Sequence, residues 1–212
     1  MSFHDRAHAG RLLAERLQGL HFNDPVVLAV PHGGLAVGAE IAPALHAELD
    51  VVLVRKLRHP LQSELAIGAV GEGASPILNE RCCRGLDRHT VECEAARRAR
   101  EVEDRLACYR AIRPAANLSG RDVILVDDGV ATGATIEAAV EVVQRRRPGR
   151  VIVALPVAPP DCLDRLGELA DEVVCLESPE DFGAVGQFYE RFEQIDDEQA
   201  CAMLRAATSG GT

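Results

Sequence analysis

The chain has 212 residues, enough for one large domain, and 47% of them are hydrophobic, which suffices for a packed core. Its formal net charge of −10 argues against general binding to nucleic acid or anionic membranes, because both require a basic surface. Seven scattered cysteines without a CxxC pair indicate reduced thiols. With no visible secretory signal and no apolar run long enough to span a bilayer, we expect a cytoplasmic protein.

Helical and strand-like segments alternate along the chain. The periodicity predicts helices over residues 4–20, 35–49, 89–113, 135–147 and 161–170, and strands over residues 26–30, 51–55, 66–70, 75–79, 122–126, 151–155 and 172–176. Residues 57–64 read as a loop, and the segment between residues 66 and 79 as a hairpin. Nearly continuous Val, Ile and Leu in the strands predict an α/β protein with a parallel sheet covered on both faces. Ligands of such sheets bind beyond the carboxyl ends of the strands.

The most informative segment runs from residue 123 to 135, with the sequence VILVDDGVATGAT. Four apolar residues run directly into Asp127 and Asp128, and a loop of small residues then opens a helix. Backbone amides of residues 131–135 can converge on a phosphate at this helix N-terminus, and the hydroxyls of Thr132 and Thr135 can add donors. The loop residues with this predicted role are Gly129, Ala131, Thr132, Gly133, Ala134 and Thr135. The simpler alternative is that Asp128 only caps the helix.

This segment resembles the phosphoribosyl pyrophosphate signature of type I phosphoribosyltransferases, in which two acids follow an apolar strand and precede a T-G-x-T loop. The resemblance implies that Asp127 and Asp128 hold the ribose hydroxyls of phosphoribosyl pyrophosphate, and that residues 131–135 hold its 5′-phosphate. It also implies a parallel-sheet, Rossmann-like fold with a small hood region. We expect one domain over residues 1–207, with the hood supplied by the N-terminal helix, by residues 178–207 or by both, and a disordered tail at residues 208–212.

Other parts of the chain agree with this resemblance. The loop Pro31-His32-Gly33-Gly34 follows the first core strand, where the family binds pyrophosphate, and Arg55 or Lys56 would lie nearby. Residues 57–73 fall where the family carries a mobile loop over the site. The order of the motifs also resembles a bacterial group of phosphoribosyltransferases with unassigned substrate, which has V-P-R-G-G in the first loop and an aromatic tail motif matched by residues 182–189.

Two departures bear on the substrate. His32 stands where that group has arginine, so the contact with pyrophosphate loses a permanent charge and could depend on pH. Ala131 stands where enzymes acting on 6-oxopurines carry an acid, which argues against hypoxanthine and guanine.

Two further features have a functional and a structural interpretation. Glu64 could act as a general acid or base, or be a solvated carboxylate. The aromatic cluster between residues 182 and 192 could stack on a nucleobase or dock the C-terminal segment on the sheet.

The resulting functional hypothesis is an enzyme that transfers a phosphoribosyl group to a nitrogen of a nucleobase-like acceptor. Mg²⁺ would be bound mainly through the pyrophosphate of the substrate, because this hard ion prefers oxygen ligands and retains waters. The absence of a transition-metal motif such as HExxH leaves no protein metal site to assign. A homodimer is expected from base rates. The alternative is a non-catalytic regulatory protein that senses a nucleotide or phosphoribosyl pyrophosphate in the same pocket.

Overall fold

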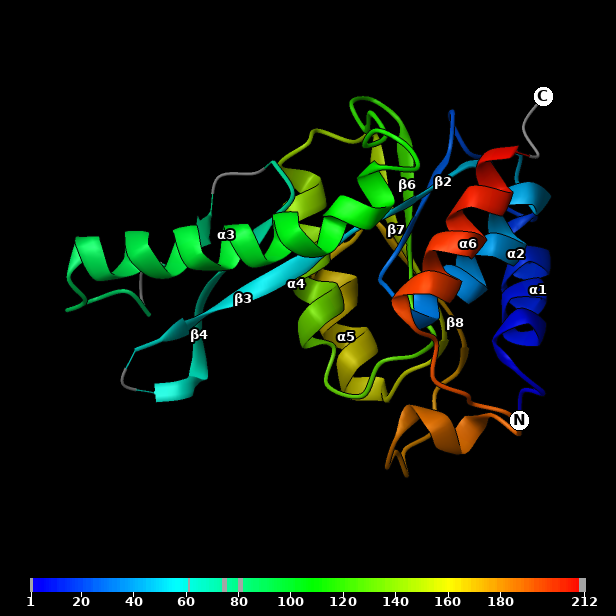
Figure 1. Ribbon diagram of the computed structural model, residues 1–212. Helices are drawn as coiled ribbons and strands as arrows, with labels where there is room; N and C mark the ends of the chain where they lie inside the picture. The colour runs from blue at the N-terminus through cyan, green and yellow to red at the C-terminus, as the bar shows by residue number, and fades with distance from the viewer. Residues whose placement is uncertain (1, 61, 74–75, 80–81, 210–212) are drawn as a thin grey trace.

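In the computed structural model, a five-stranded parallel sheet is covered by helices on both faces and is joined to a smaller antiparallel sheet (Figure 1). The structure describes residues 2–60, 62–73, 76–79 and 82–209. The main sheet has the order β2-β1-β6-β7-β8, and the small sheet the order β3-β4-β5. The strands are β1 Val26–Ala29, β2 Glu48–Val51, β3 Val54–His59, β4 Gln62–Gly71, β5 Ile77–Leu78, β6 Asp122–Val126, β7 Arg150–Val157 and β8 Glu172–Glu177.

Helices cover both faces of the main sheet because successive residues of its buried strands point in opposite directions. Val27 and Ile124 face one core, shared with α1, α2, α6 and the end of α3. Leu28 and Leu125 face the other core, shared with α4 and α5. The parallel, doubly covered sheet predicted from the sequence is therefore confirmed. The helices are α1 Arg6–Leu17, α2 Gly33–Ala44, α3 Arg88–Arg110, α4 Ala134–Gln144, α5 Pro160–Leu169, α6 Asp197–Ser209 and the short 3₁₀ helix η1 Val185–Phe188.

The predicted loop over residues 57–64 is wrong, because residues 57–59 and 62–64 belong to strands of the antiparallel sheet. Strands β3 and β4 pair from Val54 opposite Gly71 to His59 opposite Gln62. Leu57 and Ile67 are fully buried against α3, which runs along this sheet (Figure 1). The expected pairing of β4 with β5 is present, with Gly68 opposite Leu78. The small sheet forms the hood of the fold.

Two other boundaries differ from the prediction. Helix α2 ends at Ala44, next to Pro43 in its last turn, and the second core strand is Glu48–Val51 instead of residues 51–55. Helix α6 was not predicted; it continues through Thr208 and Ser209, so these residues do not belong to a disordered tail. Residues 210–212 of that predicted tail lie outside the described residues. Among the residues that the structure describes, no helix combines the length and apolarity needed to cross a membrane.

Candidate functional site

The two adjacent acids stand at the carboxyl end of β6, as the sequence predicts. All five residues of β6 are buried, and the acids follow directly after its last residue, Val126. The backbone amide of Asp128 donates to Oδ1 of Asp127 at 2.9 Å. Burial, and next the charge of the neighbouring Asp128, raise the pKa of Asp127 well above its ordinary value. Burial also raises the pKa of Asp128, although an arginine opposes this effect. Burial and the neighbouring charge therefore disfavour the state in which both acids are ionised at once.

The arginine is Arg6, at the start of α1. Its Nε donates to Oδ2 of Asp128 at 2.6 Å, and the two side chains are only 12% and 14% exposed. The Arg6 guanidinium lies 3.8 Å from the ring centroid of Phe192, which stacks on Tyr189. Tyr189 in turn donates its hydroxyl to the backbone oxygen of Asp128 at 2.5 Å. Segments from both ends of the chain therefore fix the orientation of Asp128.

The loop after β1 packs directly against this acid pair. A Cβ atom added to Gly33 would lie 1.9 Å from Oδ2 of Asp128, and one added to Gly34 would lie 2.6 Å from the backbone oxygen of Val126. A side chain at Gly34 would collide with the backbone of β6, and one at Gly33 with the Asp128 carboxylate that Arg6 holds in place, so both positions favour glycine. The amide of Val30 also donates to the Val126 oxygen at 2.9 Å. The structure thus brings the loop of residues 31–34 and the acids to one edge of the sheet.

The loop between the acids and α4 presents free amides to solvent. Ala131, Thr132 and Thr135 are exposed, and among the described residues no acceptor is in place for the amides of residues 131–135. Gly133 adopts a left-handed conformation with φ of 76°, which turns the chain into α4. On the opposite side of the loop, Arg165 donates to the backbone oxygen of Thr132 at 2.8 Å. This geometry suits an anion at the helix N-terminus.

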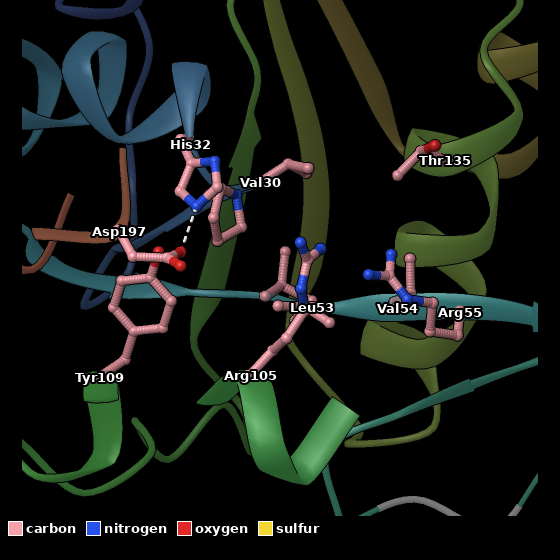
Figure 2. Close-up of a pocket in the computed structure, with 11 residues that line it drawn as sticks. Val30, His32, Leu53, Val54, Arg55, Arg105, Tyr109, Thr135 and Asp197 are labelled. Carbon is pink, nitrogen blue, oxygen red and sulfur yellow. Dashed lines mark hydrogen bonds and ion pairs between the residues drawn. The ribbon is translucent and has the colours of Figure 1, made fainter. Parts of the chain in front are cut away.

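A pocket lies between this edge of the sheet, the hood and α6. Its lining includes His32, Arg55, Thr135 and Asp197 (Figure 2). Nε2 of His32 lies 2.6 Å from Oδ1 of Asp197 at the start of α6. The peptide bond between Pro31 and His32 is cis.

Three more predicted residues lie around the acids and the hood. Gly129, at φ of 143°, packs against Val157 and Val185. Lys56 follows Arg55 in β3 but lines a separate pocket with Glu137 and Glu141, because adjacent strand residues face opposite sides. The structure thus brings Arg55, and not Lys56, to the pocket beside His32. The backbone of Glu64 lies in β4, and its side chain is outside the described part of the chain.

Residues 3–193 match the family model of the phosphoribosyl transferase domain. The chain belongs to the phosphoribosyltransferase family. The sequence of this family member is 50% identical to that of TT1426 from Thermus thermophilus, whose crystal structure is known. The two structures match with a TM-score of 0.92, over 97% of this chain and 99% of that chain. The resemblance and the fold inferred from the sequence are therefore confirmed.

Two curated relatives share 43% identity over 207 residues of this phosphoribosyltransferase-family chain. They are named as candidate phosphoribosyl transferases of Mycobacterium tuberculosis, from strains CDC 1551 and H37Rv. The match covers 97% of this chain and 47% of each relative, so the chain spans about half of their length. A Neisseria gonorrhoeae protein solved with bound ppGpp shares the fold alone, at 12% identity and a TM-score of 0.50.

Sequence reasoning missed several residues that surround the acids and His32. Arg6 is 122 positions away from Asp128, so no local pattern could pair them. Asp197 lies 165 positions from His32, so their contact could not be predicted from a local pattern either. Tyr189 was noted only as part of an aromatic cluster. A weak signal existed for α6, because Ala200, Met203 and Leu204 have helical spacing.

Proposed function

We propose that this protein transfers a phosphoribosyl group from Mg²⁺-bound phosphoribosyl pyrophosphate to a nitrogen of a nucleobase-like acceptor. The observation that carries the proposal is the convergence of three loops at one edge of the sheet. The acids follow β6, the open amide loop of residues 131–135 leads into α4, and the loop of residues 31–34 packs against the acids. In the proposal these three loops bind the ribose hydroxyls, the 5′-phosphate and the pyrophosphate of the donor, respectively.

Each group has a defined role in this proposal. Asp127 and Asp128 accept hydrogen bonds from the ribose hydroxyls, and the amides and hydroxyls of residues 131–135 bind the 5′-phosphate. His32, Gly33 and Gly34 border the pyrophosphate, with Arg55 supplying a permanent positive charge. Lys56 remains a candidate only if the hood moves, because it now lines the other face of β3.

The reaction exchanges one bond at C1 of the ribose for another. The bond from C1 to the pyrophosphate oxygen breaks, and its electron pair leaves with pyrophosphate. The lone pair of the acceptor nitrogen forms the new C–N bond. The proton on that nitrogen passes to a base, for which Glu64 of β4 is the candidate. The protein contributes positioning and electrostatic stabilisation to this exchange, without a covalent intermediate.

The donor groups at the site fit Mg²⁺. This ion is commonly bound through one or two carboxylates together with substrate phosphates and waters, and Asp127 and Asp128 are carboxylates next to the proposed phosphate sites. When bound, Mg²⁺ would neutralise charge on the pyrophosphate. The raised pKa of both acids suits this environment, because a cation and two hydroxyl donors would compensate the charge that burial disfavours.

The surroundings of the site support three further parts of the proposal. Asp128 is contacted by Arg6, which packs on Phe192, and by Tyr189, and His32 is contacted by Asp197. Helix α1 and residues 178–207 would therefore complete the hood within one domain over residues 1–207. The reduced cysteines support a cytoplasmic location, and a homodimer stays our expectation for the assembly.

A sensing role is the second candidate, because two proposed ligand groups already have internal partners. Asp128 pairs with Arg6, and His32 with Asp197. Isothermal titration with Mg²⁺ and phosphoribosyl pyrophosphate, followed by pyrophosphate release with a panel of nucleobases, distinguishes the two functions. Binding with release supports the transferase, and binding without release supports the sensor. Absence of binding contradicts the transferase and a sensor of phosphoribosyl pyrophosphate.

A further inference from the structure

One wall of the pocket beside His32 comes from a helix that no sequence motif marks. Helix α3 contributes Arg105 and Tyr109 to this wall (Figure 2). They are four positions apart, so they lie on the same face of the helix. In Figure 2 the Arg105 side chain rises from α3 toward Leu53, and the Arg55 side chain projects from β3 into the same space. Two guanidinium groups from different elements therefore share one pocket.

Among the residues that the structure describes, the charges of these two guanidinium groups are not neutralised by carboxylates, in contrast to the charge of a neighbouring arginine. Elsewhere on α3, Arg98 pairs with Glu94 and Glu101. Within the described part of the chain, Arg55 and Arg105 have no carboxylate within ion-pair distance. Burial, and next the charge of Arg105, lower the pKa of Arg55, although Glu101 partly opposes this. Arg105 is exposed and Arg55 half-buried, and their like charges repel each other at this pocket, so an anion bound there would relieve the repulsion.

Tyr109 gives a second, independent indication of a ligand. The residue is 1% exposed, and its hydroxyl has no hydrogen-bond partner among the described residues. Burial raises the pKa of this phenol, so it remains a hydrogen-bond donor at neutral pH. Buried hydroxyls in native proteins nearly always have a partner. An oxygen atom of a ligand in the pocket would supply one.

We propose that Arg105 and Tyr109 of α3 bind the pyrophosphate group of the donor, together with Arg55. The inference rests on the proposed function, in which residues 31–34 border the pyrophosphate. The amide loop of residues 131–135 provides the site for the 5′-phosphate, and its Thr135 also lines this pocket, so we assign the charged groups from β3 and α3 to the pyrophosphate. Arginine binds phosphate oxygens in pairs through its planar guanidinium, which makes Arg105 a specificity group for a polyanion.

The test is isothermal titration of the full-length protein with Mg²⁺ and inorganic pyrophosphate, and separately with ribose 5-phosphate. The variants are Arg105→Gln and Tyr109→Phe. Arg100→Gln is the matched control, because Arg100 is exposed on the same helix and lines no part of this pocket. We expect each test variant to weaken pyrophosphate binding about tenfold or more, the usual effect of losing a hydrogen bond to a charged group. Ribose 5-phosphate affinity, and both affinities of Arg100→Gln, should stay unchanged.

Tyr109→Phe separates a binding role from a structural one. Removing a buried hydroxyl without a partner should leave the melting temperature of the free protein unchanged or raise it, while pyrophosphate affinity falls. Wild-type affinity for pyrophosphate in both test variants would overturn the inference alone, provided that the wild type binds both probes. Loss of affinity in both variants without any release of pyrophosphate from phosphoribosyl pyrophosphate would support the inference and contradict the transferase function.

Discussion

Replacing Asp127 with asparagine should stabilise the free protein at neutral pH, although Asp127 belongs to the proposed site. Burial and the charge of Asp128 raise the pKa of Asp127, so the folded state disfavours its ionised form. A carboxyl with a raised pKa weakens the fold progressively as the pH rises through that pKa, and has no such effect below the unfolded value of about 3.9. Asparagine removes the charge and keeps an oxygen that can accept from the amide of Asp128.

The expected size follows from the ordinary cost of an incompletely paired buried polar group, about 1–3 kcal/mol. For a chain of this size, 1 kcal/mol corresponds to about 2–4 °C in melting temperature. We therefore expect Asp127→Asn to melt roughly 2–12 °C above the wild type at pH 7–8. The difference should shrink as the pH falls toward 4, because the wild-type carboxyl then becomes protonated.

Asp122, at the other end of the same strand, is the matched control. Burial raises its pKa, but Arg150, at 2.6 Å, and the amide of Asn23, at 2.9 Å, more than compensate, so the pKa of Asp122 is lowered overall. A lowered pKa means that ionised Asp122 stabilises the fold above its unfolded pKa, and that this contribution disappears as the pH falls. Asp122→Asn should therefore melt below the wild type at pH 7–8.

Thermal unfolding of the three proteins between pH 4 and pH 8 tests both signs. If Asp127→Asn melts at or below the wild-type temperature throughout this range, the acid pair is not under electrostatic strain in the free protein. The account of its raised pKa would then be wrong.

Three further predictions concern ligands. Replacing both Asp127 and Asp128 with asparagine should abolish binding of phosphoribosyl pyrophosphate in titration calorimetry while circular dichroism shows a folded chain, because each lost contact is worth about 1.5–3 kcal/mol; unchanged affinity contradicts their role. A crystal soaked in sulfate should show an anion within hydrogen-bonding distance of the amides of Thr132–Thr135, and an anion found only elsewhere would remove that site. Asp197→Asn should tighten pyrophosphate binding several-fold, because the Asp197 carboxylate no longer competes for His32 and its charge leaves the pocket lining, and the gain should be smaller in His32→Asn, where only the charge effect remains.

The central motif could be read from the sequence because its structure is locally determined. The strand Asp122–Val126 is uniformly apolar after its first residue, and the change to acids and small residues marks where it ends. The prediction for β2 is wrong for the opposite reason. Residues 49–54, LDVVLV, are apolar except for one acid, so periodicity gives no boundary between β2 and β3. The acid in that run, Asp50, is fully buried and paired with Arg110, a contact visible only in three dimensions.

The hood shows a second limit of local patterns. Residues 57–64 read as a loop in the sequence, yet Leu57, which stands between Lys56 and Arg58, is fully buried under α3. A single apolar anchor within a charged strand gives a weak sequence signal, since the burying partner comes from a distant helix. The same applies to Arg6, whose pairing with Asp128 depends on how α1 returns to the end of β6.

The charge distribution explains how an acidic chain can select a polyanionic ligand. Its net charge of −10 repels large polyanions such as nucleic acid at long range. The proposed site instead supplies positive potential locally, through the amide loop before α4 and through Arg55 and Arg105 in the neighbouring pocket. Such short-range groups favour a small ligand whose phosphates are separated by one sugar. Because Mg²⁺ lowers the charge that must approach the acids, the proposed complex with phosphoribosyl pyrophosphate should form much more readily with the ion than without it.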